Sequence, residues 1–191
     1  MSQTKVQLKN VRLSFAKLFK AEAFKPGDAP KYSANFLIDP STPQGKENLA
    51  AVKAGMDAAC EAKWGKGKVP RLKQDHRALK QEGEMDYDGY DGMLVVVAKD
   101  TRPPVLLDRD KSALNEQVCI AENKLYSGCY VDVLVNFWAY NHPDSKGCSA
   151  NLRAVRFREH GDTFSSVAPV DTDEFDDLEG EAVTSNDDFD L

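Results

Sequence analysis

The sequence is poor in the residues that build metal centres and disulfide frameworks. It has four cysteines and three histidines in 191 residues, and no two cysteines show CxxC spacing. A structural zinc site needs four clustered nitrogen or sulfur ligands, so we expect no metal and no cofactor. The thiols are expected to be reduced and mostly buried, as is usual in a cytoplasm.

Long hydrophobic runs are also missing. No apolar stretch approaches the roughly 20 residues that cross a bilayer, and the first residues, MSQTKVQLKN, contain no signal-peptide core. These absences predict a protein without a membrane partner that stays in the cytoplasm where it is made.

The motifs of several enzyme classes are absent as well. The sequence has no Walker loop, no nucleophile elbow and no Cys–His pairing. One enzymatic alternative stays open at Asp86, Asp88 and Asp91, because two-metal nucleases hold their cations with carboxylates. The surrounding DYDGYDG lacks the ligand spacing and final glutamate of an EF-hand. We therefore favour a hydrated loop in a protein that is not an enzyme.

What the sequence does contain is a sharp division of charge. Residues 171–191 carry ten carboxylates and no lysine or arginine. The whole chain has 31 acidic and 25 basic residues, which leaves 21 acidic against 25 basic residues in 1–170, a net charge of +4. Such a tail either keeps the protein solvated or imitates a polyanion that the body binds. We expect one domain over 1–170 and a disordered acidic tail over 171–191.

Hydrophobic periodicity predicts a mainly β protein. Alternating apolar residues indicate strands near 6–15, 32–38, 93–98, 129–140 and 148–159, with a bulge near Asn10 and a weak strand at 105–107. Helical spacing instead runs from Ser41-Thr42-Pro43, a typical helix start, to a stop at Gly65. The pattern predicts an all-β barrel or sandwich with one inserted amphipathic α-helix.

The strand at 129–140 is the strongest candidate for a binding surface. Its alternate positions from Val131 to Ala139 are apolar and predict a core face, whereas Tyr130, Trp138 and Tyr140 fall on the opposite face. Either another element covers these aromatic rings, or they are platforms on which nucleobases stack. On the return strand, the faces of Arg153 and Arg156 depend on a bulge expected near Ala154.

A basic segment is the second candidate. Residues 63–80 contain seven lysines and arginines and one acidic residue. Such cations neutralise phosphates and release counterions, although a solvated helix end and loop has the same composition. The candidate phosphate contacts in this segment are Lys66, Lys68, Arg71 and Lys73.

Residues 90–162 carry a resemblance to a known family. The segments YDGMLVVVAKDTRPPVLLD, LYSGCYVDVLVNFWAYN and KGCSANLRAVRFREHGD resemble phage-encoded single-stranded-DNA-binding proteins, a family with an OB-fold that was long a domain of unknown function. A weaker likeness in KYSANFLID and in the basic segment extends the resemblance over most of residues 5–165. It implies an OB-fold-like barrel that coats single-stranded DNA, with little sequence preference, during phage replication, recombination or repair in the host cytoplasm.

The strand and charge patterns suggest the contacts and partners for such coating. Candidate DNA contacts are aromatic rings for stacking and cations for phosphates: Tyr130, Trp138, Tyr140, Arg102, Arg153, Arg156, Lys66, Lys68, Arg71 and Lys73. The acidic tail is expected to compete for the DNA site and to recruit replication or recombination proteins through Asp187, Asp188, Phe189 and Asp190. A homodimer or a cooperative array on DNA fits such coating. The remaining alternative is a DNA-mimicking interaction protein that acts through its tail.

Overall fold

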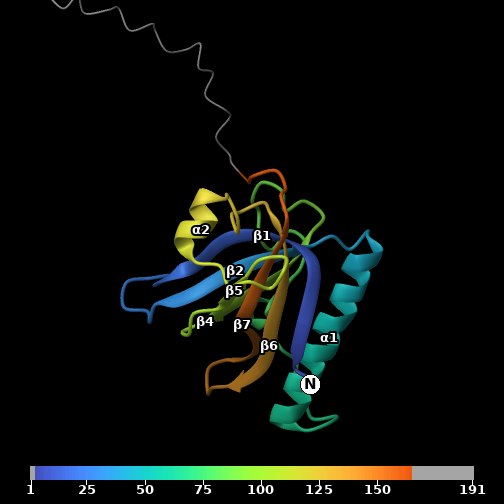
Figure 1. Ribbon diagram of the computed structural model, residues 1–191. Coiled ribbons are helices and arrows are strands. Elements are labelled where there is room, and N and C mark those ends of the chain that lie inside the picture. Colours follow the sequence, from blue (N-terminus) through green and yellow to red (C-terminus); the bar gives the residue numbers. More distant parts are fainter. Residues whose placement is uncertain (1–2, 165–191) are drawn as a thin grey trace, which may run out of the picture.

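The computed structural model describes residues 3–164, which form a closed β-barrel with a long helix along one side (Figure 1). The elements are β1 (Lys5–Glu22), β2 (Lys31–Ile38), α1 (Pro43–Trp64), a short 3₁₀ turn (Gln74–His76), β3 (Leu79–Lys80), β4 (Leu94–Asp100), β5 (Val105–Leu107), α2 (Glu116–Ala121), β6 (Tyr130–Asn141) and β7 (Lys146–Glu159). The strand order β3-β4-β2-β1-β6-β7-β5 is closed by an additional pairing of β4 with β7. The all-β barrel with an inserted helix is therefore confirmed, whereas the domain end at residue 170 and the tail at 171–191 lie outside the described residues.

The seam that closes the barrel is short. β4 and β7 pair in parallel at Ala98 and Ala150, whose small side chains are both 0% exposed. Beyond this pair the segment before β3 fills the space between the two strands: Arg77 bridges to Cys148, and the Val97 N–H donates to the Ala78 carbonyl at 2.9 Å. The two strands thus separate on one side of the seam.

The core lies inside the ring of strands and under α1. On β6 the inward side chains of Val131, Val133, Val135 and Phe137 are at most 1% exposed, as the alternation predicts. The helix approaches closely because Gly55 faces this layer: a Cβ there would lie 2.8 Å from the Phe137 ring. Burial of these side chains stabilises the barrel by the hydrophobic effect.

Helix α1 begins and ends where its sequence predicts. The Thr42 hydroxyl accepts a hydrogen bond from the Gly45 N–H at 3.0 Å, and Gly65 ends the helix with φ 90°. In the first half of α1, Asn48 accepts from the Lys9 N–H at 3.0 Å and donates to the Lys9 carbonyl at 2.8 Å. This pair of hydrogen bonds fixes the helix to the β1 bulge, which the register shift between Leu8 and Val11 confirms.

Several features were not predicted from the sequence. Strand β1 does not end near residue 15 but continues to Glu22 and projects with β2 as a hairpin beyond the barrel (Figure 1). A second register shift follows Ser14, where Phe15 has φ 47°. The short helix α2 is also additional, and its six residues are too few for a clear helical period.

The four cysteines are all free and buried, which confirms the expectation for the thiols. Burial raises the pKa of Cys129 and Cys148 to about 12 and also raises the pKa of Cys60 and Cys119. Their thiolate forms are therefore scarce at neutral pH. Separately, none of the helices in the described part of the chain has the length and apolarity to cross a membrane.

We predict that Asn48→Ala lowers the free energy of unfolding by roughly 1–2 kcal/mol, because the Lys9 backbone groups lose both side-chain partners. Chemical denaturation followed by circular dichroism measures the difference. Lys46→Ala, at an exposed site on the same helix, is the matched control and should change stability by only a few tenths of a kcal/mol. Equal stabilities of the two variants would contradict the prediction.

Candidate nucleic-acid interface

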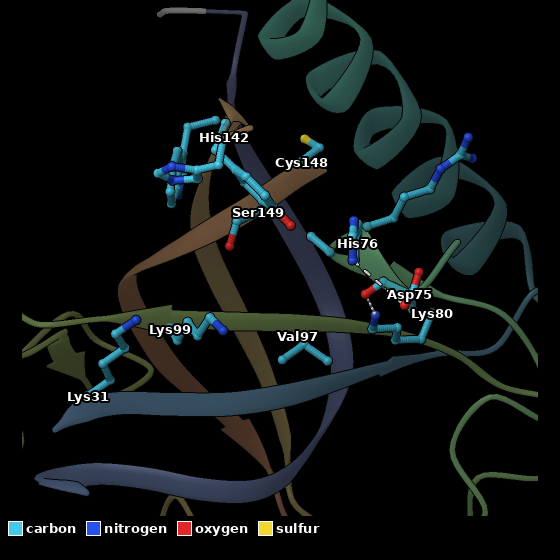
Figure 2. Close-up of a pocket in the computed structure, with 13 residues that line it drawn as sticks. Lys31, Asp75, His76, Lys80, Val97, Lys99, His142, Cys148 and Ser149 are labelled. Carbon is cyan, nitrogen blue, oxygen red and sulfur yellow. Dashed lines mark hydrogen bonds and ion pairs between the residues drawn. The ribbon is translucent and has the colours of Figure 1, made fainter. Parts of the chain in front are cut away.

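A cavity of about 310 Å³ opens where β4 and β7 separate. Figure 2 shows Lys31 and Lys99 on the β2–β4 side of this cavity, opposite Ser149 and His142 on the β6–β7 side. Trp138 and Tyr140 from β6 and Lys80 from β3 also line the cavity, together with Asp75 and His76 of the 3₁₀ turn. We call this cavity the seam cleft. It brings aromatic and cationic side chains from four strands and two connections to one place.

The aromatic side of the seam cleft is formed by β6. Trp138 is 42% exposed, and its ring lies 5.7 Å from that of Tyr140 at 53°. Their partners on β7 are Ser149 and Gly147, which carry little or no side chain above the sheet. No element in residues 3–164 covers the indole, so of the two alternatives left by the sequence, the structure favours an open platform.

The cationic side of the seam cleft holds Lys31, Lys80 and Lys99. Within the described chain none of these three forms an ion pair with a carboxylate. Burial lowers the pKa of Lys99, and repulsion from the Lys31 and Lys80 ammonium groups lowers it further. An anion between these ammonium groups would relieve that repulsion, so the electrostatics of the cleft favour phosphate.

Two arginines lie just beyond Lys99, held by one buried carboxylate. Asp100 is 6% exposed in its side chain, and its oxygens lie 3.6 Å from Arg102 Nε and 3.7 Å from Arg153 Nη1. Arg153 is the extra residue of a bulge, because Leu152 pairs with Val135 and Ala154 pairs with Leu134. The bulge expected near Ala154 is confirmed, and the Asp100 carboxylate lies at ion-pair distance from both guanidinium groups.

A second buried carboxylate, Asp132, holds two further arginines. It accepts hydrogen bonds from Arg156, from Arg158 at 3.3 Å and from the Asn10 N–H at 2.9 Å. Burial alone would raise the pKa of Asp132, but the hydrogen bonds and the positive charges outweigh it and lower the pKa. Arg156 therefore shares the outer face of β7 with Arg153, but its guanidinium is engaged by Asp132.

The structure does not bring all the predicted contact residues together. Trp138 and Tyr140 share the seam cleft, and Arg102 and Arg153 follow next to it. Tyr130 lies eight residues along β6 from Trp138, about 26 Å away, where Arg12 lies 5.8 Å above its ring. Arg156 is also remote, opposite Asp132. The four cations of the 66–73 segment do not line the cleft, so their DNA contacts stay a prediction.

Sequence reasoning missed the cations that do line the seam cleft. Lys31 and Lys99 occupy outward positions on β2 and β4, and the pairing of Ser33 with Lys99 sets them side by side. Their alternation with buried residues was visible in the sequence, but their nearness to Trp138 depends on barrel closure. Phe24, at the end of the β1–β2 hairpin, was also missed: it is 62% exposed, with Lys17 Nζ 5.9 Å from its ring.

The acidic residues proposed as an alternative metal site do not form one. Among residues 3–164 no three His, Cys, Asp or Glu side chains are grouped so that they could hold a metal ion. Asp86 and Asp88 instead line a separate cavity beside Tyr87. The nuclease alternative therefore has no supporting geometry in the described chain.

Comparison with known proteins identifies the family of the chain. The family model described as the ssDNA-binding protein of Enterobacter phage Enc34 matches residues 4–189. The chain belongs to this family. It is also 36% identical over 180 residues to putative protein p50 of Acyrthosiphon pisum secondary endosymbiont phage 1, covering 91% of this chain and 94% of the relative.

Solved structures of the family support the same conclusion for the fold. The single-stranded DNA-binding protein from bacteriophage Enc34 matches with a TM-score of 0.66 and 25% identity, over 90% of this chain and 89% of that one. The structure of that phage protein in complex with ssDNA matches with a TM-score of 0.72 and 22% identity, over 85% and 90% of the two chains. The OB-fold-like barrel expected from the resemblance is thus confirmed.

We predict that Asp132→Asn lowers the free energy of unfolding by roughly 2 kcal/mol at pH 7, because two arginines lose their carboxylate while remaining partly solvated. The folded-state pKa of Asp132 lies below its ordinary value. Its stabilisation is therefore present above the unfolded pKa, about 3.9, and is lost as the pH falls through the folded pKa. The difference between wild type and variant should shrink at low pH.

Denaturant unfolding at several pH values measures this difference, with Asp144→Asn as the control at an exposed carboxylate. A gap between wild type and Asp132→Asn that stayed constant down to pH 2 would assign the effect to packing rather than to charge.

Proposed function

We propose that this protein binds and coats single-stranded DNA with little sequence preference, without catalysing a reaction. The single observation that carries the proposal is the seam cleft, where the exposed Trp138 and its neighbour Tyr140 face three lysines that have no carboxylate partner in the described chain. Membership of a family whose model is named for an ssDNA-binding protein supports it. So does the likeness to the Enc34 protein, whose structure contains ssDNA.

The chemistry of the cleft suits a single strand better than a duplex. Unpaired bases expose their faces, so they can stack on Trp138 and Tyr140, whereas stacked base pairs in a duplex cannot. Stacking on an aromatic side chain contributes about 1–3 kcal/mol per base and does not depend strongly on sequence. The lysines opposite then neutralise the backbone phosphates, a contribution that weakens as salt rises.

We propose that the strand continues from the cleft past the end of β4. Arg102 and Arg153, at ion-pair distance from Asp100, lie beyond Lys99 and offer the next phosphate contacts. Lys31 lies at the same end, because Tyr32 pairs with Asp100, and it begins β2 directly after the β1–β2 loop, where Phe24 is exposed beside Lys17. An aromatic ring beside lysines repeats the chemistry of the cleft, so the hairpin is a second platform for the same strand.

The proposal predicts that Trp138→Ala weakens binding of a short oligothymidylate by about tenfold or more, since one base loses its stacking surface. A gel-shift series with single-stranded DNA, double-stranded DNA and RNA at two salt concentrations measures the affinity and the strand preference. Tyr87→Ala removes an equally exposed aromatic ring outside the seam cleft and should leave this affinity unchanged. Absence of single-strand binding at low salt would refute the proposed function.

The acidic tail is proposed to regulate this site. Residues 171–191 carry a charge of −10 against +4 in residues 1–170. The tail can therefore bind to the lysines of the seam cleft when DNA is absent. Phe164 lies near Arg12 and packs against the same apolar cluster as Val97, which lines the cleft. The 27 residues that follow Phe164 can span at most about 90 Å, so the cleft is within reach.

The acidic tail is proposed to have a second role besides competition with DNA, the recruitment of partner proteins. We propose that Asp187, Asp188, Phe189 and Asp190 dock on replication or recombination proteins when DNA has displaced the tail, since an aromatic side chain among acids combines steering with one buried anchor. DNA binding would then expose the docking segment. The partner protein thus binds the tail preferentially when the tail has been displaced by DNA.

We predict that deleting residues 171–191 strengthens binding of a short oligothymidylate severalfold at low salt, because an intramolecular competitor is removed. The gain should shrink as salt rises and screens the tail. Titrations of the full chain and of the truncated chain at two salt concentrations test this. Equal affinities at low salt would rule out self-competition, without affecting the proposed DNA site.

A further inference from the structure

A second cavity, which shares no lining residue with the seam cleft, combines exposed aromatic rings with carboxylates. Its volume is about 390 Å³, and the lining includes Phe15, Tyr87, Tyr90 and Phe164 with Asp86 and Asp88 at the rim. We call it the aromatic–acidic cluster. It shares no residue with the seam cleft, and its carboxylates repel a DNA backbone, so it suits a cationic ligand better.

The rings of the aromatic–acidic cluster form a connected wall. Phe15 and Tyr87 are 4.8 Å apart between centroids, and Tyr87 and Tyr90 are 5.4 Å apart. Phe15 is 48% exposed and Tyr87 is 50% exposed. Phe15 is also held in the left-handed backbone region at φ 47°, a conformation that is costly for a bulky residue. It lies at the second register shift of β1, between Ser14 and Lys17.

The charge around these rings selects a cation. Residues 81–93 contain five carboxylates and no lysine or arginine, and neither Asp86 nor Asp88 forms an ion pair within residues 3–164. The nearby Arg12 is already engaged, donating to the Asp162 carbonyl at 2.6 Å and lying 4.2 Å above the Phe164 ring. Aromatic faces beside free carboxylates bind lysine and arginine side chains by cation–π and ionic attraction.

The chain itself carries a matching cationic surface. The 65–73 loop after α1 has the sequence GKGKVPRLK, and its four cations, Lys66, Lys68, Arg71 and Lys73, are exposed and without ion pairs in the described chain. They do not line the seam cleft. Val69, 39% exposed among them, adds an apolar contact for the rings.

One molecule cannot join these two surfaces. The N-terminal end of α1 lies with Arg12 around one cavity, and Arg12 stacks on Phe164 of the aromatic–acidic cluster. The 65–73 loop follows the other end of α1, 22 residues or about 33 Å away. In Figure 1 the loop after α1 lies at the bottom and the last described residues lie at the top.

We propose that the aromatic–acidic cluster of one copy binds the 65–73 loop of the next copy on the same DNA strand. This inference rests on the proposed coating of single-stranded DNA. A single strand has a direction, so copies that bind it identically repeat head to tail, and each contact joins two different surfaces. The cluster and the loop are complementary in charge and lie at opposite ends of the molecule, as such an array requires.

Charge reversal of the full-length chain tests the contact. The variants are Asp86→Lys with Asp88→Lys, Lys66→Glu with Lys68→Glu, and all four substitutions together. Affinity is measured on a short oligothymidylate that holds one copy and on a long polythymidylate that holds many. Wild type should bind each site of the long strand at least about tenfold more tightly than the short one, the scale expected of a modest contact between charged surfaces.

Each reversed pair should remove this advantage, and the fourfold variant should restore it, whereas affinity for the short strand stays within about twofold for the Asp86 and Asp88 variant. Glu82→Lys with Asp91→Lys is the matched control: it makes the same charge change in the same loop at positions that do not line the cluster, and it should retain the advantage.

Three results would overturn the inference. The first is a wild type that binds long and short strands equally. The second is that the variant with all four substitutions does not regain the advantage on the long strand, or that the variant with Asp86→Lys and Asp88→Lys keeps it. The loop then contacts another acidic segment, such as 171–191. The third is a loop variant that weakens on the short strand as much as on the long one, because Lys66 and Lys68 are then DNA contacts. Loss of short-strand binding by wild type would instead refute the proposed function.

Discussion

The contact on which the site depends is the single parallel pairing of Ala98 with Ala150. It converts an ordered row of strands into a barrel and places β4 beside β7. Because the pairing does not continue, the strands separate and the 77–80 segment fills only part of the space. Lys99, which follows Ala98 on β4, and the rings of Trp138 and Tyr140 on β6 meet in the remaining space. A longer seam with more hydrogen bonds would have left no cleft there.

Local physics made most of the elements predictable from the sequence. The cap at Thr42, the stop at Gly65 and the alternation from Val131 to Phe137 depend on neighbours in the chain, and all three are confirmed. The aromatic half of the cleft followed from the same alternation. The cationic half did not, because Lys31 and Lys99 reach Trp138 only through strand order and closure. By contrast, the separation of Tyr130 from Trp138 follows from their eight-residue spacing on one predicted strand.

The cations on the outer surface of the barrel are held in two different ways. Asp132 is nearly buried and accepts hydrogen bonds from Arg156 and Arg158, so these two guanidinium groups are fixed before any ligand arrives. Asp100 is also nearly buried, but it lies only at ion-pair distance from Arg102 and Arg153. Lys31, Lys80 and Lys99 have no such carboxylate in the described chain and repel one another. The arginines therefore give direction at little entropic cost, whereas the lysines gain most when phosphate approaches.

The burial of the thiols has a practical consequence for studying the protein. Cys129 and Cys148, with pKa values raised to about 12, and Cys60 and Cys119 are all enclosed in the folded chain. A maleimide dye attacks the exposed thiolate, so it distinguishes an introduced surface cysteine from these four. A single fluorophore can thus be attached to the native protein while its own cysteines remain in place.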